Sequence, residues 1–139
     1  MASDIEVLVP GQAQGIVVRL EEPLSFWGGF DPKTGAIIDH RHPQLGVSLT
    51  DHIVVMTRGR GSSSSTGVLA EAIRIGTAPA AIVLREPDLI IALGALVAND
   101  LYGTSCPVIV ADDRTFAALR TGCTVDIAIE DGAITFIDV

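Results

Sequence analysis

The feature that most constrains the fold is an alternation of short apolar runs with segments of helical periodicity. Residues 53–56, 80–84 and 108–110 are continuous apolar runs, which are typical of strands buried on both faces of a sheet. Between these runs, apolar residues recur at helical spacing over residues 65–75 and 89–101. A chain with this order of elements is expected to form an α/β or mixed β/β/α domain.

Capping residues mark the ends of the predicted helices. Gly76 ends the first helix, and Asp88 begins the second. Asp112 or Asp113 begins a third, short helix that runs through Leu119. The second helix is apolar almost all round, so we expect it to be covered by its own domain or by a partner.

The remaining sequence favours strands and one long loop. Four further strands are predicted, at residues 6–9, 15–20, 124–129 and 133–137. Asp131-Gly132 is a strong turn signal that joins the last two strands as a hairpin. Residues 21–49 form an irregular stretch rich in Pro and Gly, and a loop of this length tends to be functional. No repeat or linker interrupts the chain, so residues 1–139 are expected to be a single domain.

Charge and hydropathy narrow the classes of partner. The net charge is −8, and the nine basic residues are scattered, which argues against a nucleic-acid or anionic-membrane partner. The N-terminus is acidic where a signal peptide would be basic, and no apolar run could span a bilayer, so a cytoplasmic location is expected. The mean hydropathy of +0.47 is high for a small monomer. A partner subunit would explain this value, although alanine-rich α/β folds can also reach it.

The residues that most often bind metals do not form a metal-binding pattern here. Cys106 and Cys123 have no metal-ligand spacing and are interpreted as small buried hydrophobic residues. His40 and His42 lack further ligands nearby and are interpreted as polar loop residues.

The segment from Gly59 to Thr66 is the main candidate site. It joins a buried strand to the start of a helix, where backbone N–H groups and the helix dipole favour an anion. Glycines at 59 and 61 allow a sharp turn, and Arg58 and Arg60 could bind a carboxylate or phosphate. The segment is neither a Walker A loop nor a G-x-S-x-G nucleophile elbow. In the alternative interpretation, one serine caps the helix and the others are solvated turn residues.

Four segments carry a resemblance to a known family. They are residues 24–35 (LSFWGGFDPKTG), 38–43 (IDHRHP), 59–65 (GRGSSSS) and 76–83 (GTAPAAIV). In order and spacing they closely resemble the small subunit, or swivelling domain, of the aconitase X family. The resemblance covers almost the whole chain.

The resemblance implies a swivelling β/β/α domain that closes over a large subunit carrying an iron–sulfur cluster. Members of the family are hydro-lyases, and the first serine after the glycine in a Gly-Ser-Ser motif removes the substrate's α-proton. Carried over by position, this general base is Ser62, and Arg60, Gly61, Ser63 and Ser64 would bind the substrate. A cluster typically takes three or four thiolates, so the two cysteines present require the large subunit to carry it.

The sequence leaves two candidate substrates. Bacterial members dehydrate cis-3-hydroxy-L-proline to pyrroline-2-carboxylate, and archaeal members dehydrate mevalonate 5-phosphate. The acidic composition and Ser65-Thr66-Gly67 favour the first of these small carboxylates. A non-catalytic anion-binding regulatory domain is the alternative from a different functional class.

Trp27 has two possible roles. It either borders the substrate cleft or the large subunit, or it anchors the long loop in the core.

Overall fold

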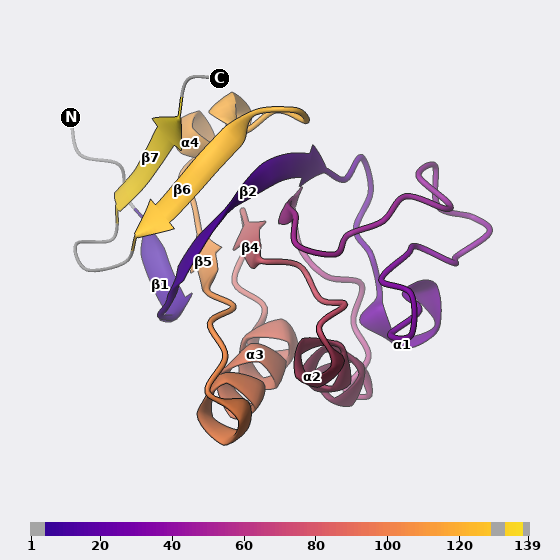
Figure 1. Ribbon diagram of the computed structural model, residues 1–139. Coiled ribbons are helices and arrows are strands. Elements are labelled where there is room, and N and C mark those ends of the chain that lie inside the picture. The colour runs from indigo at the N-terminus through magenta and orange to yellow at the C-terminus, as the bar shows by residue number, and fades with distance from the viewer. Residues whose placement is uncertain (1–4, 129–132, 138–139) are drawn as a thin grey trace.

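A curled seven-stranded sheet forms the centre of the domain (Figure 1). The computed structural model describes residues 5–128 and 133–137. The strands are β1 (Glu6–Val9), β2 (Gln12–Arg19), β3 (Ile53–Met56), β4 (Ala81–Leu84), β5 (Val108–Val110), β6 (Thr124–Ala128) and β7 (Ala133–Ile137). The helices are α1 (Phe26–Gly29), α2 (Ser65–Ile75), α3 (Leu89–Tyr102) and α4 (Asp113–Ala118). None of the described helices has the length and apolar content that a membrane span requires.

The sheet has the order β1-β5-β4-β3-β2-β6-β7. Strands β2, β3, β4 and β5 run parallel, while β1, β6 and β7 pair antiparallel with their neighbours. Strand β2 belongs both to the parallel part of the sheet and to the antiparallel part. Its residues 12–16 pair with β6, and its residues 17–19 pair with β3. The sheet can therefore curl along β2, as Figure 1 shows.

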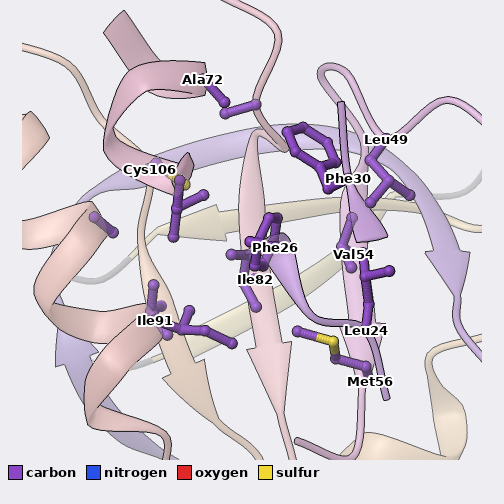
Figure 2. Packing of buried hydrophobic residues seen from close by; sticks show 14 of the residues in the cluster. Leu24, Phe26, Phe30, Leu49, Val54, Met56, Ala72, Ile82, Ile91 and Cys106 are labelled. Carbon is purple, nitrogen blue, oxygen red and sulfur yellow. The ribbon is translucent and has the colours of Figure 1, made fainter. Parts of the chain in front are cut away.

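The central strands are buried on both faces, and alternate residues serve different layers. Val54 and Met56 face a cluster that includes the buried sides of α2 and α3, which lie side by side in Figure 1. Ile53 and Val55 face a second cluster, to which α4 and β6 contribute. Figure 2 shows the first cluster, with Ile82 of β4 near its centre. These two layers explain why β3 and β4 are apolar at every position.

The long loop between β2 and β3 is held by aromatic side chains. Phe26 and Phe30 are buried with their ring centroids 5.2 Å apart in an edge-to-face arrangement. Trp27 lies between them but is 59% exposed. The interpretation of Trp27 as the core anchor of this loop is therefore wrong, because its two phenylalanine neighbours occupy that position.

Most predicted elements are confirmed at or within a residue of their ends. Strand β3 and helix α2 have the predicted bounds, and Asp112 is the cap of α4. Strand β2 begins three residues before the predicted start, because its first half pairs with β6. The kinked turn α1 was not predicted. The predicted turn at residues 131–132 lies outside the described residues, as does residue 129.

Candidate functional site

The segment Gly59–Thr66, hereafter the serine loop, leaves the carboxyl end of β3 and leads into α2. Binding sites in α/β sheets commonly lie at this end of the strands. The start of the loop is fixed against the long β2–β3 loop, because Gly59 bridges Leu24 and the N–H of Arg60 donates to the Leu24 carbonyl at 3.0 Å. The site therefore combines residues that lie 35 positions apart in the sequence (59 − 24).

The backbone at Gly59 lies so close to the first turn of α3 that a side chain there would collide with it. A Cβ added at this position would lie 2.6 Å from Asp88 Oδ2 and 2.7 Å from Ile91 Cδ1. Gly59 thus allows the serine loop to approach helix α3, rather than a ligand. A Cβ on Gly61 would meet nothing within 4 Å, so this second glycine faces open space.

The four serines of the loop have different environments. Ser62 is half-buried, and its Oγ accepts from the N–H of Ser64 at 3.3 Å. Ser63 and Ser64 are exposed, and the side chain of Ser64, the cap residue of α2, makes no capping hydrogen bond. Ser65 is buried, and its Oγ accepts from the N–H of Trp27 at 3.2 Å. Ser65 is thus a structural residue that ties the long loop to α2.

The two arginines beside the loop differ as well. Arg58 Nη1 lies 3.2 Å from Glu86 Oε2 in an exposed ion pair. Arg60 is exposed, and among the residues that the structure describes it has no ion-pair partner. The guanidinium of Arg60 is therefore the more available cation for an anionic ligand.

A shallow depression brings several predicted site residues together. It is lined by Leu24, Phe26, Gly59, Arg60, Gly61, Ser62, Ser65, Asp88, Ile90 and Ile91. Among the predicted site residues, Arg60, Gly61 and Ser62 share this depression, whereas Ser63 and Ser64 do not line it. The lining combines apolar side chains with the hydroxyls of Ser62 and Ser65, one guanidinium and one carboxylate, which are groups that can orient a small charged ligand at the mouth of the depression.

Asp88 is the one charged lining residue that sequence reasoning did not assign to the site. Its Oδ1 accepts from the N–H groups of Ile90 and Ile91 at 3.0 and 3.1 Å, which caps α3 and fixes the carboxylate. Its other oxygen points toward Gly59. The sequence predicted only the capping role, because the approach of Gly59 to Asp88 is a tertiary contact.

The cysteines of the described residues do not fit an iron–sulfur cluster. Cys106 is buried, and its Sγ donates to the Pro79 carbonyl at 3.5 Å. Burial raises the pKa of this thiol to about 12, whereas cluster ligands are thiolates. Cys123 is half-buried in the segment just before β6, and no group of three or more candidate ligands occurs in the part of the chain that the structure describes. No chemical step is therefore assigned to a cluster held by these residues.

His40 and His42, the two histidines of the long β2–β3 loop, have different environments. His42 is buried, and its Nδ1 accepts from the N–H of Gln44 at 3.0 Å. Its Nε2 therefore carries the proton and donates to the Glu22 carbonyl, also at 3.0 Å. His42 joins two parts of the long loop, while His40 is exposed.

Relatives of known function share much of this chain. Cis-3-hydroxy-L-proline dehydratase of Pseudomonas aeruginosa is 47% identical over 107 residues, which are 77% of this chain and 18% of that protein. The same-named protein of Hypocrea jecorina is 41% identical over 111 residues, 80% of this chain and 19% of that protein. The chain thus spans about a fifth of the length of these two relatives. The phosphomevalonate dehydratase small subunit of Pyrococcus furiosus is 34% identical, over 94% of this chain and 91% of that one.

A solved structure has the same fold. The holo-form of Thermococcus kodakaraensis aconitase X matches with a TM-score of 0.85 and 30% identity, over 98% of both chains. The swivelling-domain fold expected from the sequence is confirmed by this match. The family model described as the aconitase X swivel domain matches residues 3–136. The chain therefore belongs to the aconitase X swivel-domain family.

Proposed function

We propose that this chain supplies the serine loop of an aconitase X-type hydro-lyase and works with a larger polypeptide that carries an iron–sulfur cluster. The single observation that carries the proposal is the depression that joins Ser62 to Arg60 in a chain of this family. The similarity to a cis-3-hydroxy-L-proline dehydratase and to a phosphomevalonate dehydratase small subunit supports the reaction class and the need for a partner.

Ser62 is the proposed general base. Its hydroxyl lies next to the first turn of α2, and the N–H of Ser64 already donates to its Oγ. Such donors stabilise an alkoxide, which lowers the free energy needed to deprotonate the serine. Ser63 and Ser64 lie outside the depression, and Ser65 is committed to Trp27, so Ser62 is the best placed of the four.

The proposed reaction is an elimination of water. The guanidinium of Arg60 binds the substrate carboxylate, and Ser62 Oγ removes the proton from the α-carbon. The electron pair of the broken C–H bond forms the carbon–carbon double bond as hydroxide leaves the neighbouring carbon. Negative charge that develops on the carboxylate is stabilised by Arg60 and by the N–H groups of the loop. The proton and the hydroxide together make the water that is released.

The proposed substrate is cis-3-hydroxy-L-proline, with pyrroline-2-carboxylate as the product after tautomerisation. The 47% identity to the Pseudomonas aeruginosa protein of that activity supports this choice. The carboxylate of Asp88 in the same depression also supports it, because a cationic ring nitrogen would be attracted and a phosphate repelled. Mevalonate 5-phosphate is the second candidate, since the Pyrococcus furiosus small subunit aligns along nearly its whole length. Assays of the assembled enzyme on both compounds distinguish them.

The general base is tested with Ser62→Ala in the assembled enzyme. Loss of general-base catalysis is expected to lower kcat by about 10²–10⁴-fold, with little change in thermal stability or subunit association. Ser63→Ala, an exposed neighbour outside the depression, is the matched control and should cost much less. If Ser62→Ala kept most of its activity, Ser62 would not be the base.

A further inference from the structure

Helix α3 has an apolar surface on the side that faces away from the domain. Its Ile91, Ala95 and Ala98 are buried in the core. On the opposite side lie five exposed residues, hereafter the α3 stripe: Leu89, Leu93, Leu96, Val97 and Leu101, which are 75, 50, 48, 39 and 65% exposed. Exposed apolar residues are ordinary when scattered, but a contiguous group on one element marks an interaction surface.

The spacing of the α3 stripe fits a packed helix. The residues follow one another at i, i+4, i+7, i+8 and i+12, which places them along one face of α3. The face is about 18 Å long at 1.5 Å per residue, enough for several turns of a second helix. The exposed Asp100 lies on the same face, four residues after Leu96 and three after Val97, so the surface that covers this end of α3 needs a polar or basic group.

An apolar hollow lies beside the α3 stripe. It has a volume of about 310 Å³ and is lined by Leu8, Leu89, Ala92, Leu93 and Leu96. Its lining is aliphatic and comes from β1 and α3. A hollow of this size can receive large aliphatic side chains from another surface, which would give the contact a buried centre.

The α3 stripe is continuous with the candidate active site. Leu89 lies between Asp88 and Ile90, both of which line the depression of Ser62. The hydroxyl of Thr66 donates to the Ile90 carbonyl at 3.0 Å, which joins the serine loop to the same turn of α3. A body that covers the α3 stripe therefore also borders the mouth of the depression.

The relatives indicate which body that is. In the Pseudomonas aeruginosa and Hypocrea jecorina proteins, the matched region is 18% and 19% of a longer polypeptide. In those proteins a domain of this kind is covalently joined to the remaining four fifths of the chain. An aliphatic surface next to the serine loop is suited to packing against the equivalent polypeptide.

We infer that the α3 stripe and its hollow are the docking surface for the larger polypeptide of the dehydratase, which packs an aliphatic helix against them. The inference rests on the proposed function, because it takes the partner to be the other part of that enzyme. Docking at this surface places the partner beside Ser62 and covers the mouth of the depression. Apolar contact thus holds the two halves of the site together.

The test is a single charge on the α3 stripe, Leu93→Lys, in the chain co-expressed with its cognate larger polypeptide. A lysine at the centre of an apolar contact is expected to raise the Kd by about 100-fold or more, measured by co-elution and calorimetry. Ile75→Lys is the matched control, because Ile75 is 41% exposed at the end of α2 away from the serine loop. Both variants replace exposed residues and should keep the thermal stability of the isolated chain.

The outcomes separate the docking surface from the proposed function. If Leu93→Lys associated as tightly as the unaltered chain, the docking surface would be wrong while the Ser62 assignment stood. If the isolated chain formed a dimer that Leu93→Lys dissociated, the occupant would be a second copy and the inference would be overturned. If the unaltered chain bound no larger polypeptide, both proposals would fail.

Discussion

Gly59 shows at the scale of one residue how a missing side chain positions the serine loop. Gly59→Ala places a methyl group 2.6 Å from Asp88 Oδ2 and 2.7 Å from Ile91 Cδ1, so the side chains of Asp88 and Ile91 must shift, and Asp88 is held by its capping bonds to α3. Overpacking of this kind is expected to lower the free energy of unfolding by about 1–3 kcal/mol, as measured by urea denaturation.

Gly67→Ala is the matched control for this prediction. Gly67 lies in α2, and a Cβ there would meet nothing within 4 Å. Alanine at this helical position should raise the free energy of unfolding by about 0.5–1 kcal/mol. Effects of the same sign in the two variants would contradict the steric explanation for Gly59.

Cys106 gives a prediction about alkaline pH. Burial raises the pKa of its thiol from an ordinary 9.0 to about 12, so the unfolded chain loses this proton at lower pH than the folded one. The stability held by the protonated thiol is fully present below pH 9 and is lost as the pH rises toward 12. The free energy of unfolding should fall by up to about 1.4 kcal/mol per pH unit in this range. Cys106→Ala should show a shallower decline, and parallel profiles would contradict the assignment.

Single residues of the site could be predicted only where their role is local. The resemblance to a family and the position of the loop at a helix start predict Ser62 and Arg60 as site residues, and both line the depression. The burial of Ser65 could not be predicted, because its Oγ accepts a hydrogen bond from the N–H of Trp27, which lies 38 residues earlier in the sequence. The pairing of Arg58 with Glu86 is likewise a contact across 28 residues.

Asp88 caps helix α3 and also lines the depression of the candidate site. Two substitutions of Asp88 separate its structural role from a role in substrate binding. Asp88→Ala removes the acceptor for two backbone N–H groups and should cost about 1 kcal/mol of unfolding free energy. Asp88→Asn keeps an acceptor and should change stability little. If the charge also binds the substrate nitrogen, Asp88→Asn should raise KM about tenfold or more. Loss of stability in both variants would show that the carboxylate charge itself supports the fold.

The ends of elements were predictable wherever short sequence signals set them. Gly76 ends α2 with a φ of 88°, and Asp88 begins α3 by accepting from the next turn. The start of β2 could not be predicted. Its residues 12–14 are Gln-Ala-Gln, and they become a strand because residues 126–128 pair with them.

For the whole molecule, the order of elements predicted the α/β class but not the sheet order. The apolar runs at 53–56, 80–84 and 108–110 identified the buried strands, since each strand is enclosed by two core clusters. That β1 lies against β5 and β2 against β6 depends on contacts between opposite ends of the chain. The amphipathic pattern of a strand does not specify a partner so distant.

These pairings also have a consequence for synthesis of the protein. Translation proceeds from the N-terminus, so β1 and β2 leave the ribosome well before β5 and β6, their antiparallel partners. At about 5–20 residues per second, roughly 10 s pass before residue 128 follows residue 12. During this time the first half of β2 has an open edge, which is the kind of surface that chaperones shield and aggregation exploits. The parallel strands β2 to β5 pair in the order in which they are made, but folding of this domain is completed only after β6 has been translated.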